Sequence, residues 1–170
     1  MNENNNTKQM FEAGIVAFAG NDFEKSVELF TRVIEADEHN ALAAVSRGAA
    51  YLKQELLDQA WSDFDRAIKI DPGYARAHHM RGLASEKRGD DLDALPDFDR
   101  AIALNPEYGA AYYSRATLHA KLNDTDSAQE DIEMVTHLGS RNMASYMNEN
   151  NVWQTQLMRV EDAIETELQR

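Results

Sequence analysis

The five histidines of this chain are the residues that could support acid-base catalysis or hold a metal ion. No two of them lie four residues apart with a glutamate between them, which is the helical spacing that zinc hydrolases use. The chain also has no cysteine, no glycine-rich phosphate loop and no Gly-x-Ser-x-Gly elbow. We therefore expect no catalysis, no metal and no other cofactor, and we interpret His78, His79 and His119 as mainly structural.

Arginines and acidic residues recur at equal distances along the chain. Arg47, Arg81 and Arg115 follow one another at a constant interval. A pair of acidic side chains follows each arginine in the same register, namely Asp63 and Asp65, Asp97 and Asp99, and Asp131 and Glu133. We expect these acids to lie on an exposed outer face and to form structural ion pairs with the arginines. Exposed pairs of this kind contribute less than about 1 kcal/mol each.

The same interval relates the small and the large apolar residues. A repeat of about 34 residues predicts stacked helical hairpins, here four of them. Position 1 of the four units is assigned to Thr7, Ala41, Ala75 and Gly109. Position 8 then holds Gly14, Gly48, Gly82 and Ala116, and position 24 holds Phe30, Phe64, Phe98 and Ile132. Apolar residues three and four apart indicate amphipathic helices. Asp71-Pro72 and Asn105-Pro106 mark places where a helix must end.

The small residue at position 8, the alanine at 20, the aromatic residue at 24 and the proline at 32 resemble the tetratricopeptide repeat (TPR) family. This resemblance implies an all-α fold, a right-handed superhelix of four helix-turn-helix hairpins closed by a C-terminal capping helix. It also implies a noncatalytic scaffold that binds an as yet unidentified protein or peptide in the concave groove lined by the first helices. The fourth unit departs from the pattern, because it ends in Gly139-Ser140 without a proline.

The register divides the chain into six segments. We predict a disordered N-terminus at 1–6, a divergent first repeat at 7–40, repeats at 41–74 and 75–108, a repeat with a divergent end at 109–142, and an amphipathic helix at 143–170. That helix carries an apolar stripe of Leu157, Val160, Ile164 and Leu168. The stripe could fold back on the fourth hairpin, pair with a second copy or enter the groove. Pairing would make the chain a homodimer, and the alternative function is a self-assembling scaffold.

The predicted groove residues occupy positions 2, 5, 6, 9, 12 and 13 of the first helices. They are Lys8, Phe11, Ile15, Leu42, Val45, Ser46, Ala49, Lys53, Arg76, His79, Met80, Leu83, Lys87, Tyr113, Ser114 and Thr117. Basic residues outnumber acidic ones at these positions, so the groove suits a peptide with apolar anchors and some negative charge. The alternative is that the large apolar residues are core residues between adjacent first helices, namely Phe11, Ile15, Phe18, Leu42 and Val45.

Family members that bind the acidic C-termini of heat-shock chaperones resemble one another in a clamp for two carboxylates. The corresponding positions here carry Phe11, Ile15, Ser46, Arg76 and Met80, of which only Arg76 fits. Starting the clamp one unit later gives no match. A chaperone-tail clamp is therefore not expected.

Charge and hydropathy exclude two other classes of partner. The net charge is -13, from 17 basic and 30 acidic residues, which opposes a sequence-independent grip on nucleic acid. The chain has no run of 18 apolar residues, and its asparagine-rich start does not have the apolar core of a secretion signal. We expect a cytoplasmic protein that binds neither nucleic acid nor membrane.

Overall fold

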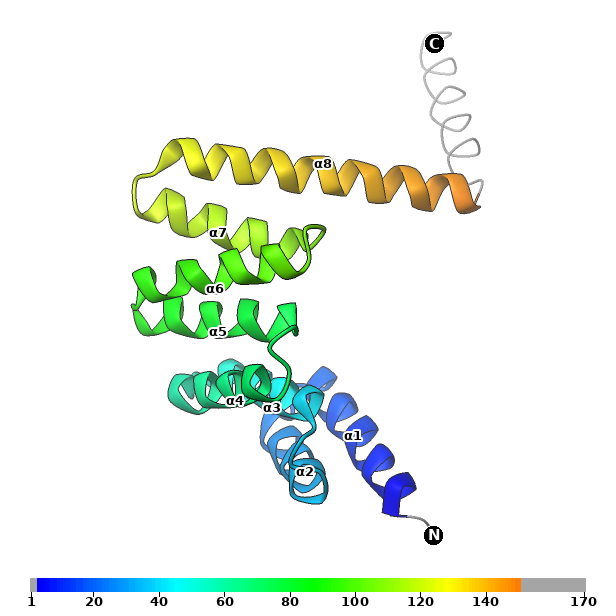
Figure 1. The fold of residues 1–170 in the computed structure, drawn as a ribbon. Helices are drawn as coiled ribbons and strands as arrows, with labels where there is room; N and C mark the ends of the chain where they lie inside the picture. Colours follow the sequence, from blue (N-terminus) through cyan, green and yellow to red (C-terminus); the bar gives the residue numbers. More distant parts are fainter. Residues whose placement is uncertain (1–2, 151–170) are drawn as a thin grey trace, which may run out of the picture.

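The computed structural model describes residues 3–150, and these residues form helices and no strand. The helices are α1 (Glu3–Ala19), α2 (Phe23–Ala36), α3 (Ala41–Lys53), α4 (Leu57–Ile70), α5 (Ala75–Arg88), α6 (Asp91–Leu104), α7 (Gly109–Lys121) and α8 (Thr125–Asn150). They stack in chain order, from the N-terminal hairpin at the bottom of Figure 1 to α8 at the top. The prediction of an all-helical array of hairpins is confirmed.

Each of the first three hairpins closes on a contact between a glycine of its first helix and a phenylalanine of its second. A Cβ atom added to Gly14, Gly48 or Gly82 would lie 2.7, 2.7 or 2.6 Å from the Cε1 atom of the phenylalanine on the opposing helix. Those rings belong to Phe30, Phe64 and Phe98, and all three are fully buried. The two helices can therefore approach this closely only because position 8 carries no side chain.

The turn inside every hairpin uses one residue in the left-handed backbone region. This residue is at position 15 in each unit, with φ of 61° at Asn21, 61° at Glu55, 89° at Gly89 and 64° at Asn123. Glycine and asparagine adopt this conformation most readily, and it commonly ends a helix. The four hairpins thus share one turn geometry despite their different turn sequences.

The turns between hairpins depend on the side chain at position 31. The Oδ1 atoms of Asp37, Asp71 and Asn105 each accept a hydrogen bond from the backbone N–H two residues later, at 3.1, 2.9 and 3.1 Å. Such a side chain competes with the helical hydrogen bonds and helps to end the helix. The fourth unit has Gly139 at this position, and α8 continues through it.

The C-terminal boundary predicted at residue 143 is therefore wrong for the described residues. Helix α8 runs without a break from Thr125 to Asn150, because neither a position 31 side chain nor a proline stops it. A Cβ atom added to Gly109, the first residue of α7, would lie 4.0 Å from Cδ1 of Leu138, and Arg141 pairs with Glu107. Residues 142–150 therefore extend past α7, as Figure 1 shows. The predicted stripe from Leu157 to Leu168 lies outside the described residues.

The N-terminal prediction also needs correction. Helix α1 begins at Glu3, whereas we predicted a disordered segment at 1–6 and a helix start at Thr7. Asparagine costs only a few tenths of a kcal/mol in a helix, and each residue added to a formed helix gains a backbone hydrogen bond. A helix already held against α2 can therefore extend through the asparagines.

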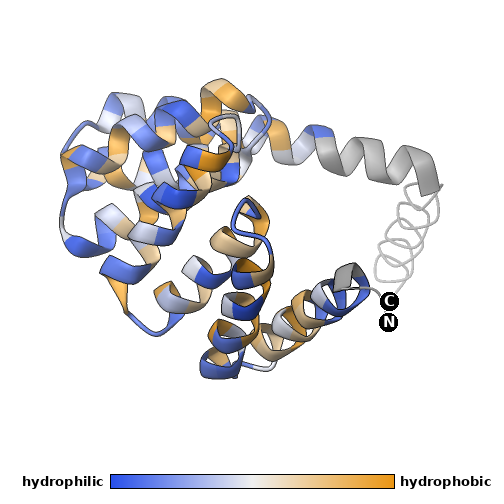
Figure 2. Cartoon of the chain, turned by 60° about the horizontal axis from the view of Figure 1, so that its bottom comes forward, coloured by the Kyte–Doolittle hydropathy of each residue, from blue (hydrophilic) through white to orange (hydrophobic). Residues whose placement is uncertain are grey.

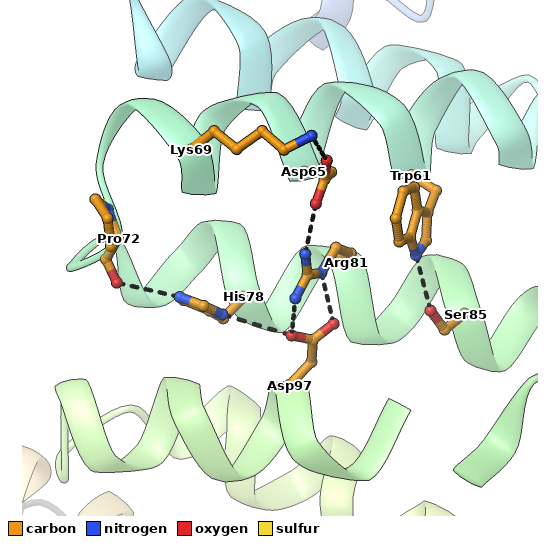
Figure 3. Close-up of polar contacts among 8 residues, drawn as sticks. All are labelled: Trp61, Asp65, Lys69, Pro72, His78, Arg81, Ser85 and Asp97. Carbon is orange, nitrogen blue, oxygen red and sulfur yellow. Dashed lines mark hydrogen bonds and ion pairs between the residues drawn. The ribbon is translucent and has the colours of Figure 1, made fainter. Parts of the chain in front are cut away.

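Arginines at position 7 connect each hairpin to the preceding one. Arg81 donates from Nε and Nη2 to Asp97 of its own unit at 2.9 and 2.8 Å, and from Nη1 to Asp65 of the preceding unit at 2.7 Å. Figure 3 shows this guanidinium between the two carboxylates. Arg115 bridges Asp131 and Asp99 in the same way, and Arg47 bridges Asp63 and the hydroxyl of Thr31.

The predicted ion pairs are confirmed for the five aspartates, and Asp99 and Glu133 at position 25 are exposed as expected, but the aspartates at position 23 are not on the outer face. Asp63, Asp97 and Asp131 are only 4, 6 and 4% exposed, because they face the arginine inside the hairpin. The side-chain hydrogen bond with Asp97 has the largest effect on the pKa of Arg81 and raises it. The pairs at Asp63, Asp97 and Asp131 are bidentate and their carboxylates are buried, so removing the arginine partner costs more than it does at a surface pair.

The curvature of the stack follows from which helices touch. Among the described helices, α1 contacts α3, α3 contacts α5 and α5 contacts α7, whereas no two even-numbered helices contact each other. The odd-numbered helices are therefore closer together and lie on the inner side of the curve. Each helix carries both hydrophobic and hydrophilic stretches (Figure 2), so one part of its surface packs in the stack while another meets solvent.

We predict that Gly82→Ala lowers the free energy of unfolding by about 1–2 kcal/mol, because overpacking against Phe98 exceeds the gain of about 1 kcal/mol in helix propensity. In a Phe98→Ile background the same change should be neutral or stabilising, since the fourth unit naturally combines Ala116 with Ile132. Urea unfolding of the four proteins measures this coupling. Equal effects of the alanine in both backgrounds would contradict the contact.

We also predict that Arg81→Met lowers the free energy of unfolding by about 3 kcal/mol, because the buried carboxylate of Asp97 loses its guanidinium partner. The matched control is Arg32→Met, which removes an exposed pair with Glu28 and should cost less than about 1 kcal/mol. Urea unfolding at neutral pH compares the two variants. Similar losses would show that the Arg81 bridge is no stronger than a surface pair.

Candidate protein-binding face

The odd-numbered helices expose a set of predicted groove residues on the inner side of the stack. We call this set the inner face and define it by the exposed or half-buried members. They are Lys8, Phe11, Ile15, Leu42, Ser46, Lys53, Arg76, Met80, Leu83, Lys87, Tyr113 and Thr117. The inner face thus combines large apolar side chains, such as Tyr113 at 57% exposure, with cationic ones. Such a combination can bind a peptide through apolar anchors and charge.

Four predicted groove residues are buried and are not part of the inner face. Val45 is 1% exposed and belongs to the core cluster around Phe64, and Ala49 is also buried. His79 and Ser114 are buried between the third and fourth units. A ligand could not touch these side chains in the described conformation. For Val45, the alternative interpretation as a core residue is the correct one.

His79 is the centre of a polar network that joins two units. Its Nδ1 atom lies 3.0 Å from the hydroxyl of Tyr108, and its Nε2 atom lies 2.9 Å from the hydroxyl of Ser114. The ring also contacts those of Tyr108 and Phe98, at centroid distances of 5.0 and 5.8 Å. Burial, aided by the positive charge of Arg76, lowers the pKa of His79 to about 4. A neutral imidazole that is satisfied at both nitrogens is a structural group here.

The inner face carries cationic side chains without ion-pair partners among the described residues. These are Lys53, Arg76 and Lys87, for which no carboxylate lies within 4 Å. Lys8 lies 3.9 Å from Glu12, and Lys121 lies 2.6 Å from Asp91. Unpaired cations on the inner side of an otherwise acidic chain provide an electrostatic preference for negatively charged segments.

A pocket of about 520 Å³ opens at the N-terminal end of the inner face, and sequence reasoning did not predict it. We call it the α1–α3 pocket, because it lies between α1, the end of α2 and the start of α3. Its lining consists of Thr7, Lys8, Phe11, Val33, Ala36, Asp37, Asn40 and Leu42. The sequence does contain a signal for it, since position 34 is Asn40 here and a tyrosine in the next two units.

A second cleft of about 440 Å³ surrounds Trp61 on another side of the stack. The indole Nε1 donates to the hydroxyl of Ser85 at 3.2 Å, as Figure 3 shows, and Arg81 and Arg88 lie over the ring. Arg88 also lies 3.2 Å from Asp90. The cations of this cleft, Arg81 and Arg88, already pair with carboxylates of the chain, so we do not include the cleft in the candidate binding face.

The part of the chain that the structure describes offers no obvious site for a metal ion. No three side chains of His, Asp or Glu converge there in a way that could hold one. None of its helices is both long and apolar enough to cross a membrane.

Comparisons with known proteins place these observations in a family. Family models described as tetratricopeptide repeat match residues 11–75 and 75–108. No curated protein matches the chain significantly. The TPR domain of Arabidopsis OM64 is 30% identical, with 68% of this chain and 95% of that domain covered and a TM-score of 0.66.

Two further structures have the same fold. The second TPR domain of human RPAP3, solved in complex with the HSP70 peptide SGPTIEEVD, is 29% identical over 66% of this chain and 97% of that one, with a TM-score of 0.62. MamA from Desulfovibrio magneticus RS-1 is 21% identical over 79% and 76% of the two chains, with a TM-score of 0.72. Together with the repeated glycine, phenylalanine and arginine contacts, these matches show that the chain belongs to the tetratricopeptide repeat family.

Proposed function

We propose that this chain is a noncatalytic protein-interaction scaffold that binds an extended peptide segment of a partner along its inner face. The observation that carries the proposal is the group of exposed apolar and unpaired cationic side chains on the inner side of the stack, with Tyr113 and Arg76 on neighbouring first helices. The RPAP3 domain, of similar fold and 29% identity, holds a peptide. The net charge of -13 supports a protein partner over nucleic acid.

The proposed ligand differs from the chaperone tails that the RPAP3 domains bind. Of the positions that would form a two-carboxylate clamp, Phe11, Ile15, Ser46 and Met80 have no cationic group, and only Arg76 could hold a carboxylate. Apolar contacts must therefore provide most of the binding energy, with one or a few acidic residues setting the orientation. We propose a peptide with spaced apolar anchors and a small excess of negative charge.

We predict that the double variant Arg76→Glu, Tyr113→Asp weakens peptide binding at least tenfold, because it removes an anchor contact and reverses a charge. Random peptides displayed on phage are first selected on the full chain, and synthetic copies are then titrated by fluorescence anisotropy. Each tenfold loss corresponds to about 1.4 kcal/mol.

The matched control for that measurement is Arg100→Glu, Leu92→Asp. It makes equivalent changes at exposed positions of α6, outside the inner face, and Leu92 is 73% exposed. Binding to this control should stay within about twofold of the parent, and both variants should keep the parent's thermal midpoint. Equal loss in the two variants, or no selected peptide that depends on Arg76 and Tyr113, would refute the inner face as the binding site.

Self-assembly is a second candidate function, and one observation favours it. Among the described helices, α8 contacts only α7, and it leaves Ile132 and Met134 39% and 37% exposed. Met134 stands at position 26, where the three other units carry arginine. An apolar residue at a position that is otherwise charged suits contact with a second copy.

If the chain self-assembles through α8, its weight-average mass should rise with concentration in analytical ultracentrifugation. Met134→Arg, which restores the residue of the other repeats, should then shift the association to at least tenfold higher concentration, because a charge would be buried in the contact. Leu92→Arg on α6 is the control and should leave the association unchanged. A constant monomer mass over the accessible range would exclude this function.

A further inference from the structure

The residue at position 34 has a different role in the first unit than in the next two. Positions 34 are Asn40, Tyr74 and Tyr108, each directly before the first helix of the following unit. Asn40 caps α3, since its Oδ1 atom accepts a hydrogen bond from the backbone N–H of Ala43 at 2.9 Å. Tyr74 and Tyr108 make no such side-chain cap for α5 and α7. The first unit therefore has a helix cap where the others have an aromatic ring.

Tyr108 shows which space that ring occupies. Its hydroxyl lies 3.0 Å from Nδ1 of His79 at position 5, and the two rings meet edge to face with centroids 5.0 Å apart. Burial raises the pKa of the Tyr108 hydroxyl, and the charge of Arg76 at position 2 partly opposes this shift. Tyr74 likewise packs against the core cluster that contains Val45, which is position 5 of its unit. In the third unit the tyrosine ring thus packs beside position 5 of the first helix.

The α1–α3 pocket lies at the equivalent place in the first unit. Its lining includes Lys8 at position 2, Phe11 at position 5 and Asn40 at position 34, which correspond to Arg76, His79 and Tyr108. Because asparagine is short and its side chain turns to the α3 backbone, no ring of the same unit fills the space. The pocket of about 520 Å³ is thus the space that a tyrosine takes in the third unit.

The apolar part of the lining, which consists of Phe11, Val33, Ala36 and Leu42, favours an apolar ring. Where His79 presents a nitrogen to the hydroxyl of Tyr108, the first unit presents Phe11, which has no polar atom. Phe11 itself contacts the ring of Phe30 at a centroid distance of 5.3 Å, and Leu42 is 46% exposed at the pocket. An added ring would extend this aromatic cluster and cover Leu42, whereas a buried hydroxyl would find no partner on Phe11.

We infer that the α1–α3 pocket is an anchor site for an aromatic side chain of a bound partner, of the phenylalanine type. The inference rests on the proposed function and specifies one residue class of the peptide. The bound ring takes the place that the chain fills with its own tyrosine in the third unit. Lys8 and Asp37 at the pocket then lie near the polar backbone on either side of the ring.

The probe for this site is N-acetyl-L-phenylalaninamide, titrated into the ¹⁵N-labelled full chain. We expect saturable shifts of the amides of Lys8, Phe11 and Leu42 at millimolar probe, as befits a ligand of this size. N-acetyl-L-tyrosinamide should bind no more tightly, and N-acetyl-L-alaninamide should cause no saturable shift. Asn40→Tyr should weaken phenylalaninamide binding more than tenfold, because the chain then fills its own pocket.

Asn40→Ser is the matched control, since serine keeps a capping oxygen and leaves the pocket open. It should bind phenylalaninamide within about twofold of the parent. Asn40→Tyr should fold, as tyrosine is the natural residue at two equivalent positions, and its unperturbed amide signals elsewhere verify this. Equal binding by Asn40→Tyr and the parent, absent binding, or shifts that lie elsewhere would overturn the inference.

Two other occupants are distinguishable in the same samples. Nuclear Overhauser contacts from the Phe11 ring to a remote residue of the same chain would show that the chain fills its own pocket. Such contacts to a second copy in a mixed-label sample would show that another copy fills it, and either result would overturn the inference of a partner's ring. Phenylalaninamide binding could be the same in Asn40→Tyr and the parent while binding of the selected peptides still depends on Arg76 and Tyr113. In that case the pocket assignment fails and the scaffold function stands. If probe binding does not depend on Asn40 and peptide binding does not depend on Arg76 and Tyr113, the scaffold proposal is refuted as well.

Discussion

The missing side chain at position 8 is the constraint on which the rest of the structure depends. With only a hydrogen atom on Gly14, Gly48 and Gly82, a phenylalanine ring can rest directly on the backbone of the opposing helix. That contact sets the distance between the two helices of a hairpin, and hence how far the next hairpin lies. In the fourth unit the sequence has Ala116 at position 8 together with the smaller Ile132 at position 24.

The arginine bridges convert separate hairpins into one stack. Because each guanidinium holds an aspartate of its own unit and an acceptor of the preceding one, neighbouring hairpins cannot rotate independently. The bridges use three of the 17 basic residues of an acidic chain. Lys53, Arg76 and Lys87 on the first helices are exposed and have no ion-pair partner among the described residues, so they remain free to attract an acidic ligand.

The sequence predicted the contacts that repeat and missed those that do not. Gly82, Phe98 and Arg81 have counterparts in the neighbouring units at the same positions, so their roles could be inferred from the pattern. The burial of side chains on the first helices was harder to predict. Helical spacing places a residue such as Val45 or His79 on a helix, but it does not show which neighbouring residue covers that side chain. His79 is covered by Tyr108, which lies in a turn of the chain far from it in sequence. The length of α8 was missed because an absent stop does not show where a helix ends.

The hydrogen bond of the position 31 side chain also bears on how such an array can evolve. An aspartate or asparagine there ends one helix and lets another hairpin begin, whereas Gly139 lets the helix run on. A duplicated unit inserted before Gly139 would therefore lengthen the stack and carry its own stop with it. The same unit added after Gly139 would meet a continuing helix. Growth by duplication is thus open inside the array and closed at its C-terminal end.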